Sequence, residues 1–264
     1  MVNDPVAIGD RVQISETGHG AGVIEEVLPR RTRFTRAGFR GKEQTLVCNI
    51  DQLVIVFACA DPQPDLWKLD RFLVAAETQG LAPLIVANKR DLVGRDDAAR
   101  FFAEYGSAGY PIVVTSASER DGTAELAARL VDRVSAFVGP SGVGKSSLLN
   151  AVQPGLNLRT SEVGGVTHKG RHTTTTAQLI PLRAGGWVAD TPGLRQLDLL
   201  DASRDEIESA FPELRLLLGR CRFQDCRHDH EPDCAVKLAV AAGELAERRY
   251  RSFLALAAEA SPRS

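Results

Sequence analysis

The chain has 264 residues, of which 44% are hydrophobic and 25% charged, a composition typical of a soluble globular protein with room for two or three domains. Its formal net charge of -2 excludes a globally basic protein, so any contact with nucleic acid must come from local patches. No apolar run approaches the roughly 18 residues that a membrane-spanning helix needs, and no signal peptide opens the chain. We therefore expect a cytoplasmic protein without a membrane partner.

The first part of the chain has a β pattern followed by a basic stretch. Residues 6–28 alternate apolar and polar side chains around a glycine-rich centre, which is typical of strands joined by turns. From Arg30 to Lys42 there are six basic residues and no acidic one, with Phe34 and Phe39 between them. This pattern suits phosphate contacts and base stacking on RNA, and a solvated basic loop is the alternative.

From residue 51 the pattern changes to that of an α/β sheet. Continuous apolar runs predict buried strands over 53–58, 84–87, 112–115 and 136–138. Helical spacing predicts helices over 66–79, 95–105 and 123–134. This alternation predicts a doubly wound, mostly parallel sheet that binds ligands at the carboxyl ends of its strands. Beyond residue 203 the chain becomes helical, with helices expected over 205–218, 234–245 and 247–259.

The first polar motif, Asn88-Lys89-Arg90-Asp91, directly follows the strand over 84–87. The carboxylate of Asp91 only accepts hydrogen bonds, so it can take the N1–H and exocyclic amine of guanine, a donor pair that adenine lacks. The stem of Lys89 would lie over the base. Backbone N–H groups after the next strand would reach the guanine O6, from Ser116, Ala117 and Ser118. Alone, such a tetrapeptide is common on surface loops.

The second motif is a phosphate loop between the strand over 136–138 and a helical run, the context that this motif requires. Its glycines let backbone N–H groups turn toward phosphates. Lys145 would reach the β- and γ-phosphates, and the hydroxyl of Ser146 would bind Mg²⁺. A glycine-rich turn without nucleotide is the alternative. The expected nucleotide-binding residues are Gly139, Pro140, Ser141, Gly142, Val143, Gly144, Lys145, Ser146 and Ser147.

The third motif, Asp190-Thr191-Pro192-Gly193, follows a short strand at 187–189. Asp190 can hold a water of Mg²⁺ and the amide of Gly193 can meet the γ-phosphate, although the motif alone could be a plain turn. Upstream, residues 161–176 are rich in Gly and Thr, as in a switch loop that orders around the γ-phosphate. Thr173 or Thr174 would supply the second hydroxyl to Mg²⁺, with Thr174 as the first choice.

A catalytic residue is needed because Leu194 stands where Ras-type GTPases have the Gln that orients the attacking water. His172, in the switch segment, is the candidate, since an imidazole accepts or relays a proton near neutral pH. A His that only packs the loop is the alternative. Lys145 and Ser146 complete the expected catalytic set.

The order of the three motifs decides the interpretation. In Ras-type GTPases the phosphate loop comes first, D-x-x-G second and N-K-x-D last. Here the guanine-reading segment 88–91 precedes the phosphate loop. This order predicts a circularly permuted GTPase.

A cysteine and histidine cluster follows in the helical part. Three thiolates and one imidazole form a closed tetrahedral Zn²⁺ set, which predicts one structural zinc bound by Cys221, Cys226, His228 and Cys234. On spacing alone, His230 is a rival ligand. Cys48 and Cys59 lie in strand-like runs, where a cysteine behaves as a small buried hydrophobe. A second basic patch is expected around the cluster, from Arg220, Arg222 and Arg227.

These motifs resemble the ribosome small-subunit-dependent GTPase A family, circularly permuted bacterial GTPases that assist maturation of the small ribosomal subunit. The resemblance extends from Gly9-Asp10-Arg11-Val12 and Asn49-Ile50-Asp51-Gln52, through the three motifs and Gly170-Arg171-His172-Thr173-Thr174, to the Cys/His cluster. It implies a partial OB-fold-like β domain over 1–48, entered midway, a permuted GTPase domain over 49–203 and a helical zinc-binding domain over 204–264. It also favours His228 over His230 as a ligand and His172 as the catalytic residue.

The expected function is hydrolysis of GTP to GDP and phosphate, as a switch in late maturation of the small subunit that is stimulated by the subunit. The implied partners are the small subunit with its rRNA and GTP or GDP, and the implied cofactors are Zn²⁺ and Mg²⁺; we expect a monomer. The alternative is a nucleotide-gated rRNA-binding module in which hydrolysis is incidental, which Leu194 favours and His172 counts against. A third hypothesis, a phosphotransferase that uses GTP, is less favoured because the sequence shows no pocket for an acceptor substrate.

Overall fold

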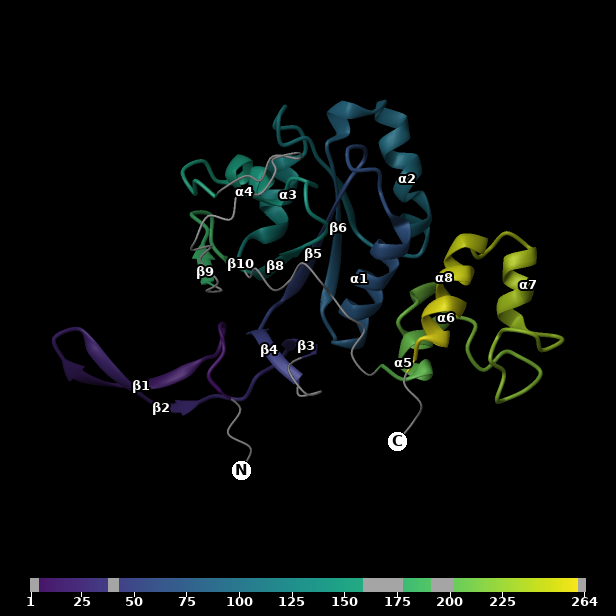
Figure 1. Cartoon of the computed structure of the whole chain (residues 1–264), viewed down its shortest axis with the longest axis horizontal. Coiled ribbons are helices and arrows are strands. Elements are labelled where there is room, and N and C mark those ends of the chain that lie inside the picture. Colours follow the sequence, from purple (N-terminus) through teal and green to yellow (C-terminus); the bar gives the residue numbers. More distant parts are fainter. Residues whose placement is uncertain (1–4, 38–42, 159–177, 191–201, 261–264) are drawn as a thin grey trace, which may run out of the picture.

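The computed structural model describes residues 5–37, 43–158, 178–190 and 202–260. A central sheet carries helices on both faces, two N-terminal hairpins lie beyond one end of it, and a helical module lies at the other side of the molecule (Figure 1). The expected strands within residues 6–28 are present. They form the antiparallel hairpin of β1 (Val12–Gly18) and β2 (Ala21–Val27), which projects away from the body (Figure 1).

Within the basic stretch, residues 33–37 form a strand, β3 (Arg33–Ala37), which pairs antiparallel with β4 (Glu43–Cys48); residues 38–42 lie outside the described part of the chain. Phe34 is fully buried and packs with the core of the central sheet, so the interpretation that Phe34 stacks on RNA bases is wrong. Arg30 forms a buried ion pair with Asp10 at 2.7 Å, which lowers the pKa of that carboxyl. Phe39 lies outside the described residues. The partial OB-fold over 1–48 stays a prediction.

The central sheet is mostly parallel, as predicted, in the order β7-β6-β5-β8-β10-β9. Its strands are β5 (Gln52–Ala58), β6 (Ala82–Asn88), β7 (Ile112–Val114), β8 (Val134–Val138), β10 (Trp187–Asp190) and the antiparallel edge strand β9 (Gln178–Pro181). β5 is buried along its whole length, which explains its unbroken apolar sequence. β9 was not predicted, because it has only four residues, of which Gln178 and Pro181 are exposed, and no continuous apolar run.

Helices cover the two faces of this sheet. α1 (Leu66–Thr78) and α2 (Arg95–Ser107) share one apolar core with Ile55 of β5, and α3 (Thr123–Leu130) and α4 (Lys145–Val152) share another with Val56. Alternate residues of one buried strand thus serve opposite faces, the arrangement of a doubly wound fold. α3 ends at Leu130 rather than 134, since the chain turns through Asp132 with a positive φ of 55°.

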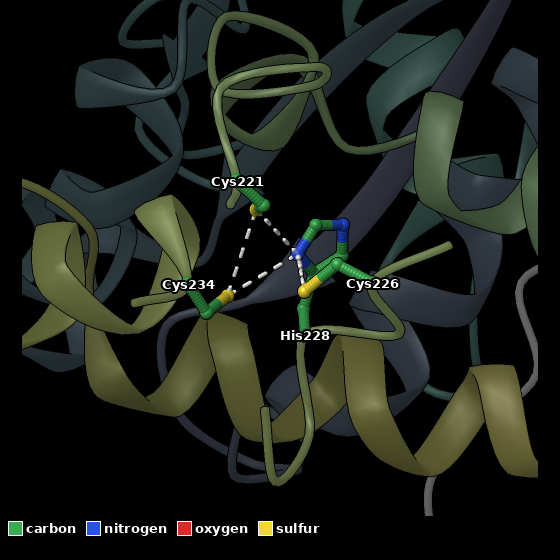
Figure 2. Close-up of side chains that lie close together, drawn as sticks. All are labelled: Cys221, Cys226, His228 and Cys234. Atoms are coloured by element: carbon green, nitrogen blue, oxygen red, sulfur yellow. Dashed lines mark hydrogen bonds between the residues drawn. The ribbon is translucent and has the colours of Figure 1, made fainter. Parts of the chain in front are cut away.

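The C-terminal module consists of α5 (Arg204–Ser209), α6 (Pro212–Arg215), α7 (Ala235–Ala241) and α8 (Glu247–Ala258). The expected helix over 205–218 is broken in two. Pro212 starts α6, because a residue without a backbone N–H fits the first turn and not a helix interior. Cys221, Cys226, His228 and Cys234 lie together in the loop between α6 and α7 (Figure 2).

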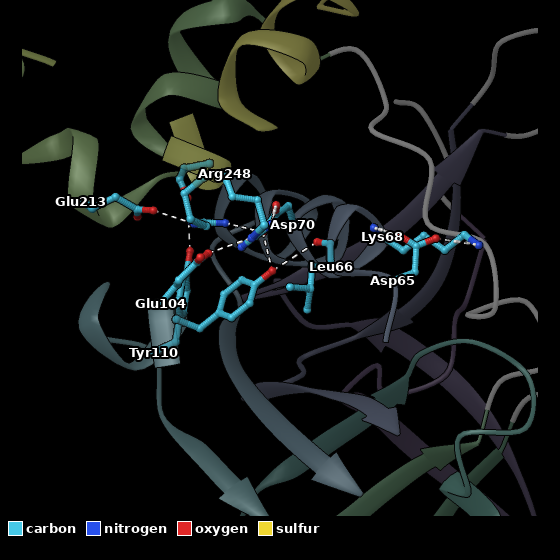
Figure 3. Close-up of polar contacts among 11 residues, drawn as sticks. Asp65, Leu66, Lys68, Asp70, Glu104, Tyr110, Glu213 and Arg248 are labelled. Atoms are coloured by element: carbon cyan, nitrogen blue, oxygen red, sulfur yellow. Dashed lines mark hydrogen bonds and ion pairs between the residues drawn. The ribbon is translucent and has the colours of Figure 1, made fainter. Parts of the chain in front are cut away.

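A buried carboxylate joins this module to the sheet domain (Figure 3). Asp70 of α1 is fully buried and accepts hydrogen bonds from Arg249 at 2.6 Å and from Arg248 at 2.7 Å. Arg249 also donates to Glu213 of α6, and Arg248 to Glu104 of α2. Helix α8 is therefore held against α1 by the buried pair of Asp70 and Arg249, and against α2 by the partly exposed pair of Arg248 and Glu104.

We predict that Asp70→Asn lowers the free energy of unfolding by about 3–5 kcal/mol, because it leaves the buried guanidinium of Arg249 without its full counter-charge. Lys68→Ala on the same helix is the control. Its exposed ion pair with Asp65 is worth at most about 1 kcal/mol. Urea unfolding of both variants measures the difference. Equal, small decreases in the free energy of unfolding would show that Asp70 contributes no more to stability than an exposed ion pair.

Candidate nucleotide and metal sites

The three nucleotide motifs meet at one edge of the sheet. β6 ends at Asn88, β8 at Val138 and β10 at Asp190, and each motif begins there or at the next residue. β6, β8 and β10 run in the same direction. Motifs that are 40 or more residues apart in the sequence therefore share the carboxyl edge, where α/β sheets bind ligands.

The phosphate loop requires glycine at two of its positions. A Cβ on Gly139 would lie 2.1 Å from the carbonyl oxygen of Val56, and one on Gly144 would lie 2.4 Å from Nδ2 of Asn88. Both residues also have a positive φ. The loop leads into α4, whose first residues are Lys145 and Ser146, and Lys145 donates to the carbonyl oxygens of Gly139 and Pro140 at 2.7 Å each. The first backbone N–H groups of α4 lack helical partners and suit an anion.

The side chain of Asn88 ties the loops to one another. It is almost fully buried, and its Nδ2 donates to the carbonyl oxygen of Val143 in the phosphate loop at 2.8 Å. Its Oδ1 accepts from the hydroxyl of Thr115, at the end of β7, at 3.1 Å. One amide thus joins the Asn88–Asp91 segment to the phosphate loop and to Thr115, the residue that precedes Ser116–Ser118. The sequence analysis placed Asn88 in the motif but missed Thr115.

The carboxylate of Asp91, which is expected to read the base, is ordered by its neighbours. Oδ1 of Asp91 accepts from the hydroxyl of Ser116 at 2.6 Å, and the oxygen of Ser118 lies 3.0 Å from that hydroxyl. The hydrogen bond from Ser116 lowers the pKa of Asp91, so this carboxyl is ionised at neutral pH and acts only as an acceptor. Lys89 adopts a left-handed conformation and donates to the carbonyl oxygen of Asp61.

Several expected site residues lie outside the described part of the chain. These are His172, Thr173, Thr174 and Gly193, and of Asp190 only the backbone at the end of β10 is described. Their roles stay predictions. Arg90 lies beside Glu119 and Asp121, to which its guanidinium is ion-paired.

The four residues of the metal cluster have converging donor atoms, all within 4.8 Å of one another (Figure 2). The Sγ atoms of Cys221, Cys226 and Cys234 lie 3.4, 3.5 and 3.3 Å from Nδ1 of His228. His230 takes no part, since its side chain is 80% exposed. This arrangement can hold a metal ion and selects His228, as the resemblance implied.

An outer carboxylate orients the histidine ligand. Nε2 of His228 lies 2.7 Å from Oε1 of Glu208 in α5, and Nδ1 points at the thiols. A carboxylate that accepts from the far ring nitrogen fixes the tautomer that leaves the other nitrogen free for a metal. Glu208 was missed by the sequence analysis, because it precedes the first cysteine by 13 residues and belongs to a helix rather than to the cluster.

Comparison with known proteins decides the family. The RsgA GTPase family matches residues 27–200. The chain belongs to the RsgA GTPase family. It is 48% identical over 251 residues to the "Small ribosomal subunit biogenesis GTPase RsgA" of Moorella thermoacetica, with 95% of this chain and 83% of the relative covered. A protein of the same name from Gemmatimonas aurantiaca is 47% identical, with 98% and 86% covered.

Two solved structures agree with this family assignment. This RsgA-family chain resembles YjeQ from Thermotoga maritima with a TM-score of 0.81 and 39% identity, covering 100% of this chain and 87% of that one. It resembles YloQ, described as a circularly permuted GTPase, with a TM-score of 0.78 and 32% identity, covering 100% and 85%. The predicted circularly permuted GTPase fold and the GTP hydrolase activity are thereby confirmed. In the described residues, no helix has the length and apolar character for crossing a membrane.

We predict that Glu208→Gln weakens metal binding about 10- to 100-fold, because the orienting charge behind His228 is lost. His230→Ala, in the same loop, should bind metal like the unchanged protein. Competition between each variant and a chelator for Zn²⁺ measures both affinities. Loss of metal in the His230 variant, with retention in the Glu208 variant, would contradict the assignment.

Proposed function

We propose that this GTPase is a switch in late maturation of the small ribosomal subunit and that the subunit stimulates its hydrolysis of GTP. Nucleotide binding in this proposal is supported above all by the buried amide of Asn88, which joins three loops at one edge of the sheet. The ribosomal part is supported by the relatives, which are named as small ribosomal subunit biogenesis GTPases. The proposed partners are the small subunit and its rRNA, and the protein works as a monomer in the cytoplasm.

In the proposed complex the base and the phosphates of GTP are held by different loops. Asp91 accepts from N1–H and the exocyclic amine, Lys89 covers the base, and the N–H groups of residues 116–118 meet O6. The backbone of residues 139–147 and Lys145 surround the phosphates. Mg²⁺, held by Ser146, Thr174 and Asp190, neutralises charge on the β- and γ-phosphates when it is bound.

The chemical step is assigned to His172. Its imidazole positions the attacking water, a task for which Leu194 has no polar group. Lys145 stabilises the negative charge that develops on the transferred phosphoryl group. The second candidate function is a nucleotide-gated rRNA-binding module with incidental hydrolysis, and Leu194 is the residue that favours it.

We further propose that the metal is a structural Zn²⁺. Zn–S bonds of about 2.3 Å and Zn–N bonds of about 2.0 Å in a tetrahedron place sulfur atoms about 3.8 Å from one another and about 3.5 Å from the nitrogen. The Sγ atoms of Cys221 and Cys234 are 3.8 Å apart, and the three sulfur-to-nitrogen distances are 3.3–3.5 Å. Four protein ligands leave no open position, so the ion stabilises the loop between α6 and α7.

The guanine pocket predicts a change of base preference. Asp91→Asn exchanges an acceptor for a donor, so the variant should lose GTP affinity by at least about tenfold and gain affinity for xanthosine triphosphate. Asp96→Asn, an exposed change on α2, is the control. Equilibrium titration with both nucleotides measures the exchange, and an unchanged preference for guanine would remove Asp91 from the pocket.

The catalytic assignment predicts a separation of binding from chemistry. His172→Ala should slow single-turnover hydrolysis about 100-fold or more, while GTP affinity stays within about twofold, because positioned acid–base groups contribute on this scale. Lys145→Ala should lose both GTP affinity and hydrolysis. Rapid-quench assays at saturating GTP report the rate. Normal turnover by the His172 variant would refute the role.

The ribosomal role predicts a reciprocal coupling. If GTP tightens binding to small subunits relative to GDP, the subunit must tighten GTP relative to GDP by the same factor. Co-sedimentation with small subunits in both nucleotide states, together with nucleotide affinities in their presence, measures the two factors. Equal affinities in both states and an unstimulated hydrolysis rate would favour the incidental-hydrolysis alternative.

A further inference from the structure

Arg90 occupies the variable position of the guanine motif, and its guanidinium reaches across to the neighbouring loop. Nη2 donates to Oε2 of Glu119 at 2.6 Å, and Nε lies 2.8 Å from Oδ2 of Asp121. The Arg90 side chain is only 17% exposed, although its partners are 54% and 47% exposed. One cation therefore forms ion pairs with two carboxylates of the loop that follows β7.

That loop is the one from which Ser116–Ser118 face the base. It is closed on itself, since the N–H of Ser116 donates to the carbonyl oxygen of Asp121 at 3.0 Å and the N–H of Glu119 donates to the Ser116 hydroxyl at 3.1 Å. At its start, the N–H of Arg90 donates to the carbonyl oxygen of Thr115 at 3.1 Å. The ion pairs of Arg90 are made with Glu119 and Asp121, later in the loop, so Arg90 contacts both the start and the end of this loop.

The balance of charge makes this attachment depend on Arg90. Asp91, Glu119 and Asp121 bring three carboxylates to two facing loops, and the guanidinium of Arg90 is ion-paired with two of them. Without it, the carboxylates would repel one another and favour separation of the loops. The hydrogen bond from Ser116 to Asp91, which orients the carboxylate proposed to read the base, joins the same two loops.

The geometry assigns Arg90 as a positioning residue that holds the two base-reading loops together and thereby sets the rate at which guanine nucleotide is released. It acts through Asp91 and Ser116 and does not touch the nucleotide. This inference rests on the proposed guanine pocket. A base held between two loops leaves when they separate, so a weaker attachment raises the release rate and leaves the chemical step at the phosphates unaffected.

The test is stopped-flow release of a fluorescent GDP from the full chain. Arg90→Ala should release GDP about three- to tenfold faster, the scale expected for two partly exposed ion pairs. KM for GTP should rise by a similar factor, with the maximal hydrolysis rate within about twofold of the unchanged protein. Arg90→Lys should restore part of the slow release, and Arg100→Ala, an exposed arginine of α2, should match the unchanged protein.

Further measurements separate positioning from mere stability. Raising the salt concentration should speed release from the unchanged protein more than from Arg90→Ala, because salt screens the ion pairs of Arg90 in addition to the phosphate contacts that both proteins share. Arg90→Glu combined with Glu119→Arg should release more slowly than Arg90→Glu alone. If Arg90→Ala does not fold, the double variant Glu119→Gln with Asp121→Asn removes the same ion pairs by neutralising the carboxylates, and it should also release GDP faster.

The outcomes are distinct. Release from Arg90→Ala at the unchanged rate overturns the inference, and so does an altered preference between GTP and inosine triphosphate, which would mean that Arg90 contacts the base. Asp91→Asn is measured in parallel. If Asp91→Asn keeps guanine preference, the pocket itself is wrong; if it prefers xanthosine triphosphate while Arg90→Ala is unaffected, only the positioning role fails.

Discussion

The nucleotide site depends on one buried amide. Asn88 donates to the phosphate loop and accepts from Thr115, and neither group has solvent to replace it. An unpaired buried polar group costs about 1–3 kcal/mol, so the three loops are most stable when they are together. The same amide explains Gly144, because a side chain there would take the space of Nδ2. The proposed base and phosphate subsites are therefore parts of one hydrogen-bonded unit rather than neighbours on a surface.

The permuted order leaves this unit intact and changes what is attached to it. The sheet needs only its strands in the right spatial order, and β6, β5 and β8 are adjacent whether or not the guanine-reading segment comes first in the chain. The C-terminal module follows the third motif and is fixed to α1 and α2 by Asp70 with Arg248 and Arg249. Because breaking such a buried network costs about 3–5 kcal/mol, the module holds the loop of the Cys/His cluster in a fixed orientation to the sheet.

Local patterns in the sequence predicted the buried strands and the motifs that follow them. Contacts between residues far apart in the chain were not predicted. Continuous apolar runs located β5 and β6 to within two residues, and the phosphate loop and the Asn88–Asp91 motif lie at the strand ends where the sequence placed them. Phe34 was misread because an aromatic residue among arginines looks the same whether it faces solvent or the core. Asp70 could not be foreseen, since its partners lie 178 and 179 residues away. Spacing left His228 and His230 as alternatives, and only the converging thiols separated them.

We propose that three segments, distant in the sequence, together bind one guanine nucleotide. Amide hydrogen exchange with GDP and with ADP tests it directly, because protection reports contact at each segment separately. GDP should slow exchange together in residues 88–91, 116–118 and 139–147, and ADP should slow it in none of them as strongly. Protection confined to 139–147, or equal protection by ADP and GDP at 88–91, would contradict the claim.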